Sequence, residues 1–290
     1  MSTQAALRAF LAARDDAEPA VAAGMRSRLL EGSSDRAIIL LHGLTASPPA
    51  WEAIAADLNA AGATVAIVRL PLHGYADRMT TALDGLSVEL LTSDVRAVVA
   101  AVAVLGKPIV IGGHSLGGTL AIHAAATLGD VERIVAIAPF LGIAGVPHEV
   151  HAALVPLMRA LPKVFLWWDP IDRERQLPAH GYPRYPLRAL AVGLGIADAV
   201  YDDASRPPRA RAIELVINAQ ESSISNRTVR RLAGRWRAAG AAVGVHQLDG
   251  LPPSHDIIEP VRPNSLRARR TLVRLLLGEG SATALTRYPI

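Results

Sequence analysis

Short apolar runs rich in β-branched residues alternate along the chain with longer stretches of helical periodicity. A run that is apolar on both faces indicates a buried strand of a parallel sheet, which helices cover from both sides. The strand-like runs are Ala37–Leu41, Thr64–Val68, Ile109–Ile111, Val131–Ala138, Ile213–Ile217 and Ala242–His246. The helical stretches are Ser47–Ala61, Val88–Leu105, Thr119–Leu128, Arg227–Ala239 and Ser265–Leu277. The pattern therefore predicts an α/β fold with a mostly parallel sheet and helices on both faces.

Residues with end-of-helix preferences flank several of these stretches. Ser87 is a candidate N-cap for the helix that begins at Val88, and Gly106 follows its end. Ser225 and Asn226 are capping candidates for the helix that Gly240 closes. These signals support the helix assignments independently of the apolar pattern.

The alternation of strands and helices breaks between about Gly142 and Pro208. This segment is rich in proline and aromatic residues, with helical stretches at Glu149–Leu161 and Leu187–Val200 and no clear strand. We expect a helical cap inserted over the carboxyl edge of the sheet. The predicted division is a first part of the core over 1–141, with an N-terminal helix, a cap over 142–208 and a second part of the core over 209–290.

Composition narrows the classes of protein that this chain can belong to. A chain of 290 residues, 51% of them hydrophobic, can form one large α/β domain with an insertion and bury a sizeable core. It has no cysteine, which excludes disulfides, thiolate metal sites and a cysteine nucleophile.

The charge pattern favours a solvated surface over a nucleic-acid partner. The formal net charge is +4, almost entirely from arginine, and basic residues interleave with acidic ones. The N-terminus lacks the pattern of a signal peptide, and the longest apolar run, Val95–Leu105, is interrupted by Arg96. We therefore expect a cytoplasmic protein without stable membrane insertion. The sequence leaves its oligomeric state open.

The segment around Ser115 carries the most specific chemical signal. The run Ile109–Ile111 leads into Gly113-His-Ser115-Leu-Gly117, and a helical stretch follows. A G-x-S-x-G match alone occurs by chance, but the order strand, sharp turn, helix exposes a serine as a nucleophile. Glycines on both sides are expected to let the backbone take a strained conformation without a Cβ clash. Ser115 is therefore the candidate nucleophile.

A serine nucleophile needs a histidine base, and His255 is the candidate. It follows the last predicted strand in a loop that Pro252 and Pro253 stiffen. Loops that leave the carboxyl ends of parallel strands converge on one edge of the sheet, so His255 and Ser115 are expected to meet. Most of the other histidines have structural explanations, since they lie beside the nucleophile, on a helix, within a strand or in the cap segment.

The acid that orients the base should follow the penultimate strand. Glu221 is the only carboxylate in that segment, Leu215–Asn226, and a glutamate can accept the imidazole N–H and stabilise the imidazolium. Asp169, Asp249 and Asp256 remain as alternatives.

Two backbone N–H groups are needed to stabilise the oxyanion. Leu116 would supply one, because it follows the nucleophile at a helix N-terminus, where the dipole favours an anion. Leu44 would supply the other from the loop His42-Gly43-Leu44-Thr45, where Gly43 allows a close approach of the backbone. We expect His42 to be a structural hydrogen-bonding residue and not a second base.

Five motifs together resemble the α/β-hydrolase superfamily, within it serine carboxylesterases and monoacylglycerol-lipase-like enzymes. They are His42-Gly-Leu-Thr-Ala-Ser-Pro48, Leu70-Pro-Leu-His-Gly74, Gly113-His-Ser-Leu-Gly117, Asn218-Ala-Gln-Glu221 and Ser254-His255-Asp256. The resemblance implies an eight-stranded, mostly parallel sheet, a cap domain, acyl transfer to Ser115 and no cofactor. Such families usually carry Asp where Glu221 stands.

The sequence thus predicts a serine hydrolase that cleaves a small-molecule acyl ester, with a short- to medium-chain or monoacylglycerol-like acyl group. Trp167, Trp168 and Tyr182 of the cap are expected to line the acyl pocket. Three alternatives keep the same nucleophile: an acyltransferase, an amidase or a carbon–carbon bond hydrolase. A non-catalytic binding protein on this scaffold is a further alternative.

Overall fold

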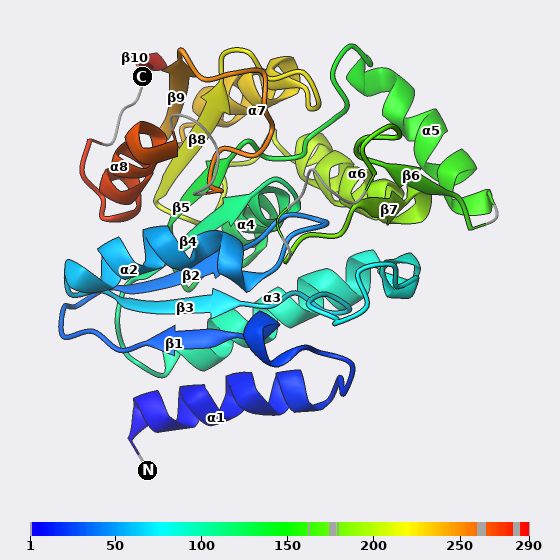
Figure 1. The fold of residues 1–290 in the computed structure, drawn as a ribbon. Coiled ribbons are helices and arrows are strands. Elements are labelled where there is room, and N and C mark those ends of the chain that lie inside the picture. Colours follow the sequence, from blue (N-terminus) through cyan, green and yellow to red (C-terminus); the bar gives the residue numbers. More distant parts are fainter. Residues whose placement is uncertain are drawn as a thin grey trace.

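Eight strands form one twisted sheet in the computed structural model, which describes residues 2–161, 163–173, 178, 180–259, 265–280 and 285–289. The order is β1-β3-β2-β4-β5-β8-β9-β10, with β1 antiparallel to β3 and every other neighbouring pair parallel (Figure 1). The strands are β1 (Arg28–Leu30), β2 (Ala37–Leu41), β3 (Thr64–Val68), β4 (Ile109–His114), β5 (Val131–Ile137), β8 (Ala212–Asn218), β9 (Val243–Asp249) and β10 (Leu285–Pro289). The predicted α/β fold with an eight-stranded, mostly parallel sheet is confirmed.

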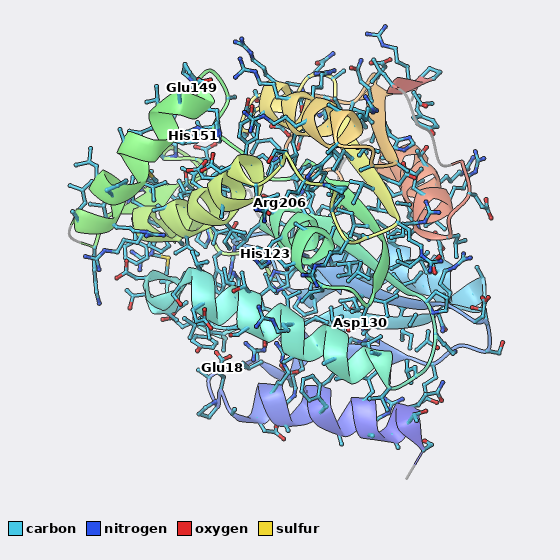
Figure 2. All side chains as sticks on the ribbon, turned by 180° about the vertical axis from the view of Figure 1, so that it is seen from behind. Glu18, His123, Asp130, Glu149, His151 and Arg206 are labelled. Carbon is cyan, nitrogen blue, oxygen red and sulfur yellow. The ribbon has the colours of Figure 1, made fainter. Side chains whose placement is uncertain are left out.

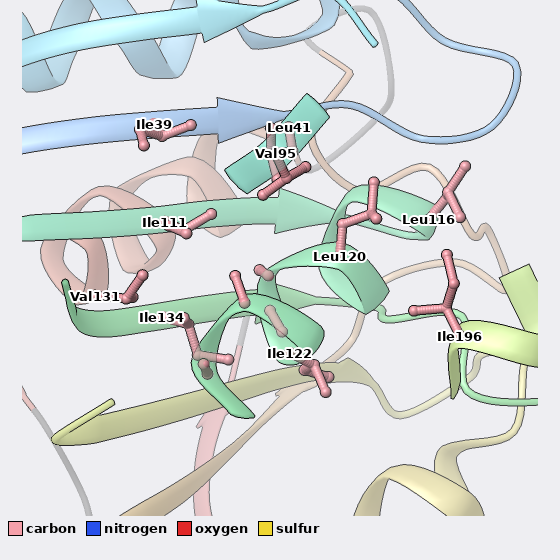
Figure 3. Packing of buried hydrophobic residues seen from close by; sticks show 14 of the residues in the cluster. Ile39, Leu41, Val95, Ile111, Leu116, Leu120, Ile122, Val131, Ile134 and Ile196 are labelled. Carbon is pink, nitrogen blue, oxygen red and sulfur yellow. The ribbon is translucent and has the colours of Figure 1, made fainter. Parts of the chain in front are cut away.

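Helices cover both faces of this sheet and enclose two apolar cores. Successive residues of a strand point to opposite faces. Ile39 and Leu41 of β2 belong to one core, which includes residues of α1, α3, α4 and α7 and is shown in part in Figure 3. Ile38 and Leu40 belong to the other, which includes residues of α2 and α8. Each fully buried Ile or Leu contributes about 1.5–3 kcal/mol. The helices are α1 (Thr3–Asp16), α2 (Glu52–Ala60), α3 (Val88–Ala103), α4 (Leu116–Thr127), α7 (Asn226–Ala238) and α8 (Ser265–Leu276).

The segment between β5 and β8 holds two helices and a small hairpin-like sheet. Its elements are α5 (His148–Ala160), β6 (Phe165–Trp167), β7 (Arg184–Pro186) and α6 (Leu187–Asp202), with β6 antiparallel to β7. The two helices agree with the predicted ones, but the short β6–β7 pair has no counterpart in the sequence analysis. Helix α6 lies against α4, so this segment sits beside the helix that follows Ser115 (Figure 1). The proposed limits of a cap domain stay a prediction.

The helix ends follow the capping signals in part. The Ser87 side chain accepts a hydrogen bond from Leu90 N (3.0 Å), and Ser225 accepts one from Thr228 N (3.2 Å). The predicted helix over 47–61 instead begins as a 3₁₀ turn, Pro48–Trp51, before α2. Within the described part of the chain, no helix is long and apolar enough to cross a membrane.

A buried ion pair ties α1 to the loop after β3. Arg69 and Asp15 are each 1% exposed, and Arg69 Nε donates to Asp15 Oδ1 at 2.7 Å. The same guanidinium donates to Glu18 Oε1 (2.9 Å) and to the carbonyl oxygens of Leu70 (3.1 Å) and His73 (3.2 Å). The network therefore fixes the turn over 69–74 from beneath.

We expect Asp15→Asn to lower the free energy of unfolding by about 3–5 kcal/mol, because it leaves a buried guanidinium without its nearest counter-charge. Denaturant unfolding measures the change. Asp203→Asn is the control, since the Asp203 and Arg206 side chains are 62% and 79% exposed, and such pairs contribute at most about 1 kcal/mol. Equal effects of the two substitutions would contradict the assigned role of the buried pair.

Candidate active site

A cavity of about 220 Å³ lies where the carboxyl ends of the parallel strands meet the segment between β5 and β8. Ser115 follows β4, and His255 follows β9, as the sequence analysis expected. The two residues line the same cavity although they are far apart in the chain. The cavity-lining residues used below are Leu44, Ser115, Trp168, His180, His255 and Glu259.

Ser115 occupies a strained turn between β4 and α4. Its φ of 54° and ψ of −116° lie in a backbone region that residues other than glycine rarely adopt. Such a conformation costs about 1–3 kcal/mol. Hydrogen bonds hold the turn: Ser115 N donates to Ile137 O (3.0 Å), and Ser115 O accepts from Phe140 N (3.1 Å) and Thr119 N (3.0 Å). The surrounding strand and helix thus fix the hydroxyl rigidly.

The glycines that flank Ser115 avoid Cβ clashes at the strained turn, as the sequence analysis expected, while the strain itself falls on Ser115. Neither Gly113 nor Gly117 has a positive φ. A Cβ on Gly113 would lie 2.1 Å from Gly117 O, and a Cβ on Gly117 would lie 2.2 Å from Leu41 O. The positive φ belongs to the serine itself, and the glycines let the strand, the turn and the helix approach each other.

The structure brings His255 and Glu221 into contact. His255 Nδ1 lies 3.0 Å from Glu221 Oε2, and the Glu221 side chain has no exposed surface. Burial alone would raise the pKa of Glu221, but the hydrogen bond and charge of His255 and the N–H groups of Ser223 and Ile224 outweigh it. The pKa of Glu221 is therefore lowered, and the carboxylate is ionised where it faces the imidazole.

The other carboxylates that the sequence left open lie elsewhere. Asp169 accepts hydrogen bonds from the N–H groups of Ile171 and Asp172. Asp249 accepts from Gln247 Nε2 at 2.6 Å. Asp256 lines the cavity, but the contact with His255 Nδ1 is made by Glu221. Their placement leaves Glu221 as the carboxylate that faces the base candidate.

Asn218, at the end of β8, holds the loop that carries His255. Its fully buried Nδ2 donates to Pro252 O (2.8 Å) and Ser254 O (3.0 Å), and its Oδ1 accepts from Gln220 N (3.0 Å). One side chain therefore fixes both the histidine loop and the loop that leads to Glu221. The sequence analysis quoted Asn218 as part of a motif but gave it no role.

We expect Asn218→Ala to lower kcat about 10- to 100-fold with little change in KM. Two hydrogen bonds of about 1 kcal/mol each are lost, and each 1.36 kcal/mol of barrier corresponds to about tenfold in rate. Asn59→Ala is the matched control, since Asn59 Nδ2 also donates to two carbonyl oxygens, those of Glu31 and Ala63. A change in KM alone, or equal kcat losses in both variants, would count against a positioning role.

His114 supports the same loop from β4. Its Nε2 lies 3.0 Å from the carbonyl oxygen of His255, and the two ring centroids are 5.1 Å apart. Burial and the neighbouring charge of His255 lower the pKa of His114 to about 4. The ring is therefore neutral at neutral pH and acts as a hydrogen-bond donor to the loop.

The two predicted oxyanion donors lie on either side of Ser115. Leu116 is the first residue of α4, so its N–H has no partner within the helix. Leu44 lies in the loop after β2, and a Cβ on its neighbour Gly43 would lie 3.3 Å from Ser115 Cβ. The glycine thus permits the close approach of this loop to the candidate nucleophile.

Two buried histidines hold the Leu44 loop in place. His73 Nε2 lies 2.6 Å from Leu44 O, and burial lowers the pKa of His73 to about 4. His42 Nε2 accepts a hydrogen bond from Leu70 N at 3.0 Å, as expected for a structural histidine. The loop is therefore linked to the turn that Arg69 supports.

The three aromatic residues predicted for the pocket have different positions. Trp168 lines the cavity, and its Nε1 donates to Thr45 Oγ1 at 2.7 Å. Tyr182 is 3% exposed, does not line the cavity, and its hydroxyl accepts from Tyr75 N at 2.7 Å. Trp167 lies on β6 outside the described lining, with a guanidinium, that of Arg173, over its ring.

A second histidine–carboxylate pair in the cavity was missed by the sequence analysis. His180 Nε2 lies 2.9 Å from Glu259 Oε2, and the Glu259 side chain is 3% exposed. The two residues come from different loops with no motif around either, so the sequence offered no signal for their contact. They place a buried polar group at the cavity wall.

Comparisons with known proteins give relatives of this chain by family profile and by fold. The profile of the Alpha/beta hydrolase family matches residues 38–262. A monoacylglycerol lipase from Paleococcus ferrophilus superposes with a TM-score of 0.68 at 20% identity, covering 87% of this chain and 98% of that one. A metagenome-derived lipolytic enzyme of the LipS and LipT pair gives 0.67 at 18% identity, covering 89% and 100%. A soluble variant of the Saccharomyces cerevisiae monoglyceride lipase, solved with a substrate analogue, gives 0.65 at 11% identity, covering 87% and 90%.

Curated relatives by sequence are protein phosphatase methylesterases. The mouse protein is 29% identical over 135 residues, which is 46% of this chain and 34% of that protein, and the bovine protein is 29% identical over the same length, 35% of its own chain. The match thus spans about a third of the length of these relatives.

Proposed function

The chain belongs to the alpha/beta hydrolase family, and we propose that it hydrolyses carboxylic esters of small molecules through an acyl-enzyme on Ser115. One observation carries the proposal: Ser115 shares a cavity with His255, whose Nδ1 contacts a buried, ionised Glu221. Nucleophile, base and orienting acid are the parts that acyl transfer by serine requires.

The proposed reaction proceeds in two halves. As Ser115 Oγ attacks the ester carbonyl carbon, His255 Nε2 takes its proton, and Glu221 stabilises the resulting imidazolium through Nδ1–H. The N–H groups of Leu44 and Leu116 hold the oxyanion. The imidazolium then gives its proton to the leaving alcohol, and an ester of Ser115 remains. Water attacks that ester with His255 as base, which releases the acid and restores the serine.

The size of the cavity favours an ester with a short- to medium-chain acyl group, or a monoacylglycerol-like ester. About 220 Å³ lies below the roughly 300–1,000 Å³ that is common for small-molecule sites. The His180–Glu259 pair provides a polar contact for an alcohol that carries hydroxyl groups, such as a glycerol part.

The proposal is tested with p-nitrophenyl esters of increasing acyl length, with release of p-nitrophenol by wild type and Ser115→Ala as the readout. We expect hydrolysis by wild type to peak at short or medium chains. Absence of activity at every length would refute the ester-hydrolase proposal. Added alcohol acceptors separate hydrolysis from acyl transfer, since an acyltransferase would form mainly the new ester.

The likeness to methylesterases favours a second candidate, the cleavage of methyl esters. Methyl and glyceryl esters of the same acid distinguish the two candidates. A higher kcat/KM for the glyceryl ester supports the first proposal, and a higher value for the methyl ester supports the second.

A further inference from the structure

Two histidines and an aspartate gather between α5 and α6, outside the cavity that contains Ser115. His148 and His151 lie one turn apart on α5, and Asp198 lies on α6. One ligand atom from each side chain lies within 4.8 Å of the other two. Figure 2 shows Glu149 at the outer edge of the molecule and His151 further in, near α6.

All three side chains present a buried atom without a hydrogen-bond partner among the described residues. These atoms are His148 Nδ1, His151 Nδ1 and Asp198 Oδ1. His151 is 0% exposed, and the His148 and Asp198 side chains are 12% and 21% exposed. An unsatisfied buried polar atom costs about 1–3 kcal/mol, and a shared cation would satisfy all three atoms at once.

The separations suit a small divalent cation. His148 Nδ1 lies 3.6 Å from Asp198 Oδ1, and two ligands of a tetrahedral Zn²⁺ with bonds of about 2.0–2.1 Å lie roughly 3.3 Å apart. All three ligand atoms lie within 4.8 Å of one another, so small side-chain rotations would bring them to one cation. Imidazole and carboxylate are ligands that Zn²⁺ accepts, and three protein ligands leave a fourth position for water.

The surroundings hold the two imidazole rings in place. The His148 ring centroid lies 3.9 Å from that of Tyr201, on α6. A Cβ on Gly142 would lie 2.5 Å from His151 Cε1, so only glycine leaves room for this ring. When His151 binds a cation through Nδ1, its ring proton lies on Nε2. Nε2 then no longer accepts a hydrogen bond from Ile143 N, and that contact is already long, at 3.5 Å.

The charges around the cluster leave the carboxylate free for a cation. Arg231, the nearby arginine on α7, is paired with the exposed Glu149 at 3.1 Å. Among the described residues, the ion-pair contact of Asp198 itself is the one with His148, at 3.6 Å.

We propose that His148, His151 and Asp198 form a binding site for a transition-metal cation such as Zn²⁺, which fastens α5 to α6. The site is separate from the catalytic proposal and does not depend on it. Helix α6 contacts the core beside the nucleophile turn, since a Cβ on Gly193 would lie 3.4 Å from Leu116 Cδ1. A bound cation would therefore stabilise the segment that covers the cavity.

The test uses the full chain stripped of metal and titrated with Zn²⁺ by calorimetry, with Co²⁺ absorption as a second readout. We expect saturation at one equivalent, a rise in Tm, and a Co²⁺ spectrum of low coordination number. Asp198→Asn should weaken binding by more than about 100-fold, because losing even an outer-shell partner costs about 10–100-fold. His148→Gln tests the site again if Asp198→Asn does not fold.

Asp203→Asn is the matched control, since it removes an exposed carboxylate that pairs with Arg206 and should leave the affinity unchanged. Equal affinity of wild type and Asp198→Asn would overturn the proposal, as would binding that does not saturate at one equivalent. If no Zn²⁺ binds, the contact between His148 and Asp198 needs no cation, and the proposal is wrong.

Discussion

Ser115→Ala is expected to lower kcat/KM for ester hydrolysis by at least about 10⁴-fold, because removal of a serine nucleophile leaves only substrate binding and oxyanion stabilisation. The substitution keeps the Cβ, so the strained turn with φ of 54° is retained. Hydrolysis of a p-nitrophenyl ester, with circular dichroism as the check on folding, measures the effect.

Ser223→Ala is the control for this experiment. Ser223 also lines the cavity, but we assign its side chain no part in the reaction, so kcat/KM should stay within the range of wild type. A Ser115→Ala variant that retains wild-type activity would show that another group attacks the ester.

Glu221→Gln should lower kcat by about 10⁴-fold while KM changes little. The amide cannot stabilise the imidazolium and favours the wrong tautomer of His255, and this is the magnitude seen when the triad acid becomes an amide. Glu221→Asp keeps the charge but shortens the side chain, so its loss should be smaller. Stopped-flow measurement of acylation separates kcat from binding.

Substitution of the other candidate carboxylates shows which result would contradict the role of Glu221. Asp256→Asn and Asp169→Asn should each leave kcat close to that of wild type, since neither carboxylate contacts His255 Nδ1. A large loss in either variant, together with a small loss in Glu221→Gln, would move the role of the acid to that residue.

The lowered pKa of Glu221 also predicts how the stability difference between wild type and Glu221→Gln depends on pH. A carboxyl group with a pKa lowered by folding stabilises the protein above its ordinary pKa of 4.5, and that contribution disappears as the pH falls through the lowered value. Wild type should therefore exceed Glu221→Gln in stability near neutral pH. The difference should shrink as the solution becomes more acidic than pH 4.5.

The central strands could be predicted from the sequence because they are buried on both faces and read as continuous apolar runs. The edge strands β1 and β10 could not: β1 has three residues with one of them buried, and the residues of β10 alternate between exposed and partly buried. The short β6–β7 pair escaped for the same reason. The apolar pattern of a segment shows whether it is buried. These strands form through pairing with a neighbouring strand, which the pattern of a single segment does not show.

The candidate site, like the fold, could be predicted only in part. The order of Ser115, Glu221 and His255 along the chain predicted which loops would meet, because parallel strands deliver their carboxyl ends to one edge. Which carboxylate faces His255 depended on side-chain direction, as did the contact of His180 with Glu259. Gly113 and Gly117 avoid Cβ clashes as expected, but the sequence did not show that the positive φ falls on the serine, nor that the Gly117 Cβ would meet the distant Leu41.

The proposed mechanism requires Ser115 to be an activated nucleophile. Labelling with a fluorophosphonate probe, followed by peptide mapping, measures this reactivity. Wild-type protein should acquire one phosphonyl group on Ser115, His255→Ala should react much more slowly, and Ser115→Ala should not react there. Folded wild-type protein that remains unlabelled, or that carries the label on a different residue, would contradict the proposed mechanism.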